Sequence, residues 1–206
     1  MFSAYQADMH YAHKMRFSGS SSTWRSHLQV LICTPGLWVL GAHRLAHLAE
    51  CTSCSWLVSV PLKVFVRVSN YLTQICTKCE ILPSTVIDPG VYLGDEGHII
   101  LGARTVGSGT MIHHSVTIGM SVTDSGVPDI GRDVWIGPNC VIHGAIRVAD
   151  GVTILPDTVL TKNLPPRTVV KGNPARIVRR DYDNSTLRQS CDLTAATQLG
   201  ATKVDN

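Results

Sequence analysis

Aliphatic residues recur at every sixth position through the middle of the chain. In the most regular stretch these residues are Ile130, Ile136, Ile142, Val148, Ile154 and Leu160. Four positions after each of them comes a second residue suited to an interior: Val134, Cys140, Ile146, Val152, Thr158 and Leu164. An amphipathic helix needs a period near 3.6 and a strand a period of 2, so a period of six fits neither. The pattern instead predicts a β-solenoid, in which three short hexapeptide faces make one coil of about eighteen residues.

Two shorter blocks upstream follow the same rule. The first has inward candidates at Ile81, Ile87 and Leu93, with fourth-position partners at Thr85, Val91 and Gly97. The second has inward candidates at Val106, Ile112 and Ile118, and it is offset from the first by one residue. Each inward side chain should stack on its equivalent one coil away, so about four to five coils share one core. We therefore predict a mainly β fold, a parallel β-helix over residues 80–180.

The flanking segments lack the repeat. Residues 1–79 contain two apolar stretches, 28–42 and 56–75, which we predict to be helices of an N-terminal helical region. The first is too short to span a bilayer, and the second carries Lys63 and Arg67 in its middle. We expect both to pack against the solenoid or a partner subunit, with peripheral membrane contact as an alternative. Residues 181–206 are polar, which predicts a flexible tail.

The overall charge is mild. A formal net charge of +3 and a pI near 8.5, without a stripe of Lys or Arg, argue against a nucleic-acid partner. The N-terminus lacks the layout of a signal peptide. We therefore expect a cytoplasmic protein.

The seven cysteines include two C-x-x-C pairs, Cys51 with Cys54 and Cys76 with Cys79. Such pairs can bind Zn²⁺ as four thiolates, and His43 lies nearby at helical spacing from His47. The segment between the pairs is apolar and helical in texture, without the glycines of a zinc ribbon. Since a cysteine also serves as a small core hydrophobe, we expect thiols that bind no metal.

Four segments carry a family resemblance: 112–119 (IHHSVTIG), 126–131 (GVPDIG), 134–137 (VWIG) and 169–178 (VVKGNPARIV). Together with the repeat they resemble the left-handed β-helix acyltransferases, in particular serine acetyltransferases and their relatives in bacterial exopolysaccharide and capsule clusters. The resemblance implies a left-handed helix, a homotrimer and acetyl-CoA as co-substrate, with no permanently bound cofactor. It further implies that acetyl-CoA contacts Gly119, Gly137, Lys171 and Arg176, the last two through its phosphates.

Acyl transfer from a thioester to a hydroxyl needs a general base, and histidine suits that role because it titrates near neutral pH. In serine acetyltransferases the catalytic histidine follows an inward aliphatic by two positions. In this sequence that position is Asp95, two after Leu93. The aspartate of the family falls on Glu80, and a second family histidine falls on Val127. Two serine-specific features are therefore altered.

His114 offers a replacement base. It lies two positions after Ile112, as Asp95 lies two after Leu93, so the two should share one corner about 4.8 Å apart along the axis. We predict His114 as the base and Asp95 as its orienting carboxylate. Polysaccharide-cluster relatives commonly carry a histidine at this position. His98 is our second choice, and His113 should face the other way.

These residues support three functional hypotheses. The first is an acetyl-CoA-dependent O-acetyltransferase that acts on a sugar hydroxyl in exopolysaccharide or capsule synthesis. The alternative keeps the chemistry and makes the acceptor L-serine, for cysteine biosynthesis. The last is an inactive trimeric scaffold or binding module, because the usual base is replaced.

Overall fold

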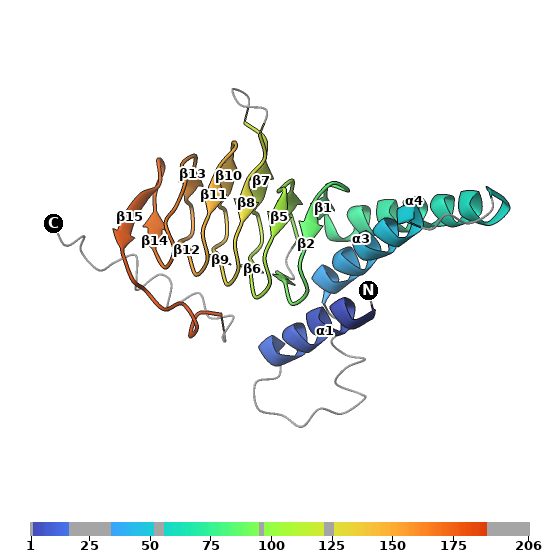
Figure 1. The fold of residues 1–206 in the computed structure, drawn as a ribbon, viewed down its shortest axis with the longest axis horizontal. Helices are drawn as coiled ribbons and strands as arrows, with labels where there is room; N and C mark the ends of the chain where they lie inside the picture. The colour runs from blue at the N-terminus through green and yellow to red at the C-terminus, as the bar shows by residue number, and fades with distance from the viewer. Residues whose placement is uncertain (1, 17–33, 52–55, 95–96, 122–125, 189–206) are drawn as a thin grey trace.

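The computed structural model describes residues 2–16, 34–51, 56–94, 97–121 and 126–188. From residue 80 onward the chain winds through three sheets in turn, and every strand pairs with the equivalent strand one coil away (Figure 1). Sheet A contains β1 (Glu80–Ile81), β4 (Ile100–Leu101), β7 (Thr117–Gly119), β10 (Val141–His143) and β13 (Val159–Leu160). Sheet B contains β2 (Val86–Ile87), β5 (Thr105–Val106), β8 (Asp129–Ile130) and β11 (Arg147–Val148). Sheet C contains β3 (Tyr92–Leu93), β6 (Met111–Ile112), β9 (Trp135–Ile136), β12 (Thr153–Ile154), β14 (Val169–Lys171) and β15 (Arg176–Arg179).

The sheets form a three-sided parallel β-helix, as the repeat predicted. All pairings in the three sheets are parallel except the last, where β15 turns back antiparallel on β14. In sheet C the inward residues stack in register from coil to coil: Leu93, Ile112, Ile136, Ile154 and Val170. The predicted inward aliphatics belong to one buried core, and so do their fourth-position apolar partners. Burial of stacked aliphatic side chains is therefore what holds successive coils together.

The one-residue offset between the first two blocks has a structural origin. Leu93 pairs with Ile112, as the offset requires. The next inward residue of sheet A is Leu101, which the six-residue rule does not predict because it lies eight positions after Leu93 and five before Val106. The extra residues lie in the corner between β3 and β4, where Gly97 adopts a φ of 74°.

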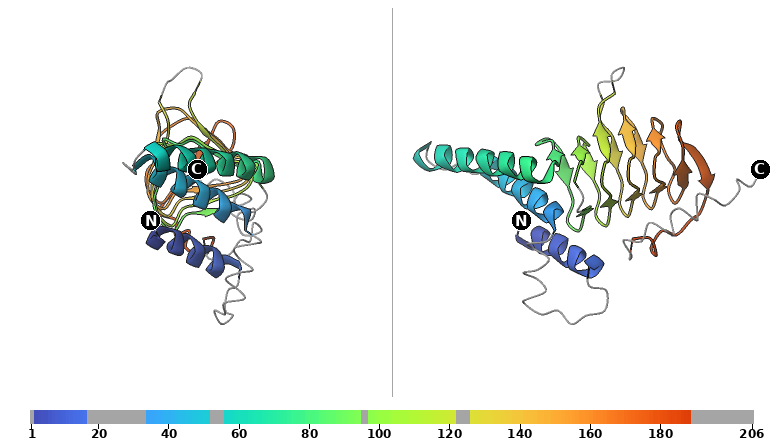
Figure 2. Two further views of the ribbon diagram at one scale, coloured as in Figure 1. Left: turned by 90° about the vertical axis from the view of Figure 1, so that its right-hand side faces the viewer. Right: turned by 180° about the vertical axis from the view of Figure 1, so that it is seen from behind.

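Among the described residues, three helices precede the β-helix: α1 (Phe2–Arg16), α3 (Pro35–Cys51) and α4 (Trp56–Thr77). The predicted N-terminal helices are confirmed, with the first apolar stretch becoming helical at Pro35 and its start, 28–33, outside the described residues. Figure 2 shows α3 and α4 side by side, extending from the first coil away from the sheets. None of the described helices combines the length and hydropathy that a bilayer span requires.

A buried ion pair fixes α1 and α3 to the β-helix. Arg44 of α3 donates to Asp8 of α1 at 2.8 Å, and the Asp8 side chain is fully buried. The N–H of Gly90, in the turn before β3, donates to the other oxygen of the same carboxylate at 2.7 Å. At Gly36, an added Cβ would lie 2.4 Å from the carbonyl oxygen of Leu93, so only glycine lets α3 approach β3 this closely.

The outward face of sheet C carries a second apolar layer. Its members come from α1, α3, sheet C and the segment after β15: Ala12, Leu37, Tyr92, Met111, Trp135, Leu155, Val169 and Leu187. Residues 182–188, here called the C-terminal strap, fall within the predicted flexible tail, yet Asn184 and Leu187 are buried against the β-helix. Residues 189–206 lie outside the described residues.

Candidate active site

The candidate base His114 occupies the corner that leads from sheet C to sheet A. The preceding residue, His113, donates its N–H to the carbonyl of Ile136, and the carbonyl of His114 accepts the N–H of Asn139 at 3.3 Å. One coil earlier, Gly94 donates to Ile112, and a Cβ added to Gly94 would lie 3.1 Å from the His114 nitrogen. The half-buried His114 therefore lies at the same corner as Gly94, one coil further along.

Asp95, the predicted orienting carboxylate, lies outside the described residues, so its pairing with His114 remains a prediction. His98 follows on the same corner. It is exposed, with a φ of 57°, and the carbonyl of Gly97 before it accepts the N–H of Ser115 at 3.2 Å. This hydrogen bond joins the turn of His98 to the residue after His114. The two candidate bases thus belong to adjacent coils of one corner.

His113 has a different environment from His114. Its ring packs against Trp135 at a centroid distance of 4.9 Å, and only 6% of the residue is exposed. Burial lowers the pKa of His113 to about 4, and the nearby His114 contributes a smaller decrease. A buried imidazole with a lowered pKa is mostly neutral at neutral pH. We therefore prefer the half-buried His114 to the buried His113 as the candidate base.

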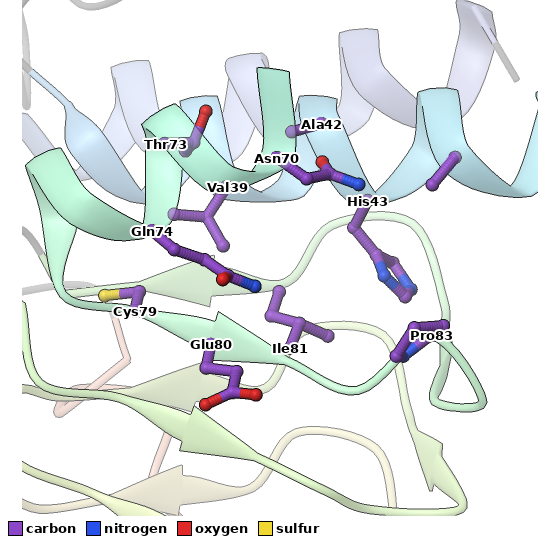
Figure 3. A pocket seen from close by; sticks show the side chains of 11 residues that line it. Val39, Ala42, His43, Asn70, Thr73, Gln74, Cys79, Glu80, Ile81 and Pro83 are labelled. Carbon is purple, nitrogen blue, oxygen red and sulfur yellow. The ribbon is translucent and has the colours of Figure 1, made fainter. Parts of the chain in front are cut away.

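Glu80 lies at the start of β1, where its N–H donates to the carbonyl of Ile99, the residue after His98, at 2.7 Å. It helps to line a cavity of about 240 Å³ between α3, α4 and the first coil. Figure 3 shows the Gln74 amide reaching from α4 toward β1, whereas the Glu80 carboxylate points away from the helices. The catalytic role of Glu80 stays a prediction.

The same cavity is lined by His43, whose role is structural. Its Nε2 lies 3.0 Å from the carbonyl oxygen of Thr85, and its ring meets that of His47 edge-on. Burial lowers the pKa of His43 despite the bond to Thr85. The histidine thus links α3 to the first coil.

The cysteine pairs are only partly described. Cys54 and the side chain of Cys51 lie outside the described residues. Cys76 is exposed and Cys79 is buried, and both are free thiols. Within the described part of the chain, no three His, Cys, Asp or Glu residues are grouped so that they could hold a metal ion.

The predicted acetyl-CoA contacts lie on two sheets, with Gly119 in sheet A and Lys171 and Arg176 in sheet C. Lys171 and Arg176 face each other in the pairing of β14 with β15, and both are exposed, so two cations meet on the last coil. A Cβ added to Gly119 would meet no atom within 4 Å, which leaves its backbone open to a ligand. At Gly137 an added Cβ would lie 2.8 Å from the Pro156 nitrogen, so packing alone explains that glycine.

Comparisons with known proteins agree with this architecture. Residues 128–162 match the family model described as bacterial transferase hexapeptide (six repeats). The chain carries the hexapeptide repeat of bacterial transferases. It also aligns with the serine acetyltransferase of Synechococcus elongatus, at 29% identity over 159 residues, which are 76% of this chain and 62% of the relative. The chain thus spans less than two thirds of the length of that relative.

Solved serine acetyltransferases share the hexapeptide fold. The soybean enzyme complexed with serine superposes with a TM-score of 0.70 and 26% identity, covering 85% of this chain and 68% of that one. The enzyme of Brucella abortus in complex with coenzyme A gives a TM-score of 0.67 and 25% identity, covering 86% and 67% respectively. These relatives are serine acetyltransferases, and the exopolysaccharide and capsule resemblance finds no support among them.

Proposed function

We propose that the protein is an acetyl-CoA-dependent O-acetyltransferase. The observation that carries the proposal is the hexapeptide β-helix with His114 at the corner between β6 and β7. The similarity to serine acetyltransferases, one of them solved with coenzyme A, supports the same chemistry. In this proposal acetyl-CoA is a co-substrate, and no permanently bound cofactor or metal takes part.

We propose His114 as the general base. Its imidazole takes the proton of the acceptor hydroxyl while the hydroxyl oxygen attacks the thioester carbonyl. The tetrahedral intermediate then collapses, the carbon–sulfur bond breaks, and the imidazolium returns its proton to the leaving thiolate. Asp95 would orient the ring and stabilise its charged form. Lys171 on β14 lies three strand spacings from β6, about 14 Å along the axis, and Arg176 lies one spacing further on β15, where both would neutralise the phosphates of the coenzyme.

For the acceptor, the relatives favour the serine alternative over the sugar hydroxyl that we ranked first. The reported relatives are serine acetyltransferases, and one is solved with serine. We therefore propose L-serine as the acceptor. A sugar hydroxyl remains the second candidate because of one specific observation: Asp95 and Val127 stand where serine acetyltransferases carry histidines.

The proposal includes a cytoplasmic homotrimer. In sheets A and B the outward positions of the first two coils are exposed: Glu80, Ile100, Val86 and Thr105. These faces are open to neighbouring subunits, whereas sheet C is covered by the chain itself. We propose that residues 1–79 form a helical region, residues 80–180 the catalytic domain and residues 181–206 a tail.

The decisive experiment follows thiol release from acetyl-CoA with L-serine and with a panel of nucleotide sugars. We expect turnover with serine, and His114→Ala should lower the rate by roughly a hundredfold or more, because general-base assistance is lost. The Michaelis constant for acetyl-CoA should move little, since the imidazole acts on the acceptor.

His98→Ala is the matched control on the same corner and should retain most of the activity. If His98→Ala abolishes turnover while His114→Ala leaves it intact, the base is His98. Absence of thiol release with every acceptor would favour the inactive scaffold.

A further inference from the structure

Helix α4 exposes a continuous apolar face. Seven of its large apolar side chains are between 52% and 68% exposed: Val60, Val64, Phe65, Val68, Tyr71, Leu72 and Ile75. Their spacings of three and four residues put them on one side of the helix. Large apolar side chains at scattered surface positions are ordinary, but a contiguous patch of this kind marks a contact with a partner or a membrane.

No other described segment of the chain covers this face. α4 packs against α3, burying Val66 and half-burying Asn70 and Thr73 on the opposite side of the helix. Figures 1 and 2 show the helix projecting beyond the first coil, away from the three sheets. The seven side chains therefore face outward along the projecting part of the molecule.

The charges on α4 have one sign. Lys63 and Arg67 are exposed, and the helix sequence contains no Asp or Glu. The surface of sheet B differs, because there Arg104 pairs with Asp129 at 3.4 Å. A helix with an apolar face, aromatic residues and only basic charges is typical of a segment that lies in the interface of an anionic membrane.

We propose that α4 binds the surface of membranes that contain anionic lipids. Phe65 and Tyr71 would enter the boundary between headgroups and acyl chains, and Lys63 and Arg67 would meet lipid phosphates. Contact between the α4 faces of two copies fits the charges less well, since no carboxylate of either helix could meet the four cations. The helix would lie on the bilayer, because it is not apolar enough to cross it.

Co-sedimentation with vesicles tests the proposal without reference to catalysis. The full chain should pellet with vesicles of phosphatidylglycerol and phosphatidylcholine, and much less with phosphatidylcholine alone. Val64→Asp should lower the bound fraction at least tenfold, and the double change Lys63→Gln, Arg67→Gln should remove the preference for anionic vesicles. Met120→Asp is the matched control, because Met120 after β7 is 61% exposed and Val64 is 56% exposed. It should bind like the wild type.

Two results would overturn the proposal. One is wild-type pelleting that does not depend on the charge of the lipid. The other is a fall in molar mass of Val64→Asp, measured by light scattering without lipid, because α4 would then be a contact between subunits. Circular dichroism of each variant verifies that the helices remain folded.

Discussion

The outward faces of the three sheets differ, although the strands behind them follow one repeat. In sheet C the outward residues Tyr92, Met111, Trp135, Thr153 and Val169 are all buried. In sheet A, Glu80, Ile100 and Thr117 are exposed at the corresponding positions. Figure 1 shows why, since α1 and the C-terminal strap both lie along the same side of the β-helix.

The difference shows which sheets the chain covers with its own segments and which it leaves exposed. Helix α1 and the strap meet beside sheet C. There the carbonyl of Gly109 accepts hydrogen bonds from the Tyr11 hydroxyl of α1 and from Arg188 of the strap. Sheet C is thereby closed by the chain itself, while sheets A and B are left for other contacts. The candidate base lies where the closed face meets an open one, at the corner between sheets C and A.

Truncation of the outer layer should give the largest effect on stability. Trp135 is 1% exposed and packs under α1 and the strap, so Trp135→Ala should lower the free energy of unfolding by about 3–5 kcal/mol. Ile100→Ala is the comparison on sheet A, and it should cost less than about 1 kcal/mol because Ile100 is 45% exposed. Urea unfolding measures both. Equal losses would mean that sheet C is no better covered than sheet A.

The covered face should also make stability depend on pH. The folded-state pKa of His113 is about 4, against about 6.5 for an unperturbed histidine. Above about pH 6.5 the imidazole is neutral in both states. As the pH falls toward 4, the unfolded chain binds a proton that the folded chain excludes, so stability decreases by up to about 3 kcal/mol. His43, whose pKa burial also lowers, acts in the same direction.

The contribution of His113 is isolated by comparing unfolding midpoints at pH 7 and pH 4.5. His113→Phe keeps an aromatic ring against Trp135 and should lose less stability on acidification than the wild type. His98→Gln, a change at an exposed position, should keep the wild-type slope. An unchanged slope in His113→Phe would show that the protonated ring reaches solvent.

The interior of the β-helix could be predicted from sequence because one constraint fixes it. Every inward position must hold an aliphatic side chain that stacks on the next coil. The six-residue spacing alone is therefore enough to predict that Ile136 and Ile154 point inward. The same register predicts that His114 lies one coil from Asp95, which is outside the described residues. Leu101 was not predicted as an inward residue, because the corner before it holds extra residues that interrupt the six-residue spacing. Its side chain nevertheless stacks on Ile81 of the preceding coil.

The outer layer could not be predicted in the same way. Trp135 and Met111 occupy outward positions, and the repeat treats them like Thr117. Both residues are buried by α1 and the strap, two segments that lie far from them in the sequence. Composition gives no sign of the strap either, because a polar segment predicts a flexible tail. Asn184 is nevertheless buried, since its amide meets backbone groups of the coils.

The smallest expected effect concerns that strap. The Asn184 amide donates to the carbonyl oxygens of Asp133 at 2.8 Å and Val152 at 3.3 Å, and its own oxygen accepts from Arg188. Asn184→Ala should lower the free energy of unfolding by about 1–2 kcal/mol, because the Asp133 carbonyl loses this donor and Arg188 loses an acceptor, while the Val152 carbonyl keeps the N–H of Trp135. Asn163→Ala is the matched control, since Asn163 is exposed and accepts the N–H of Arg147 at 2.8 Å. It should cost less than about 0.5 kcal/mol. If both variants unfold at the same urea concentration, the strap rests on sheet C without stabilising it.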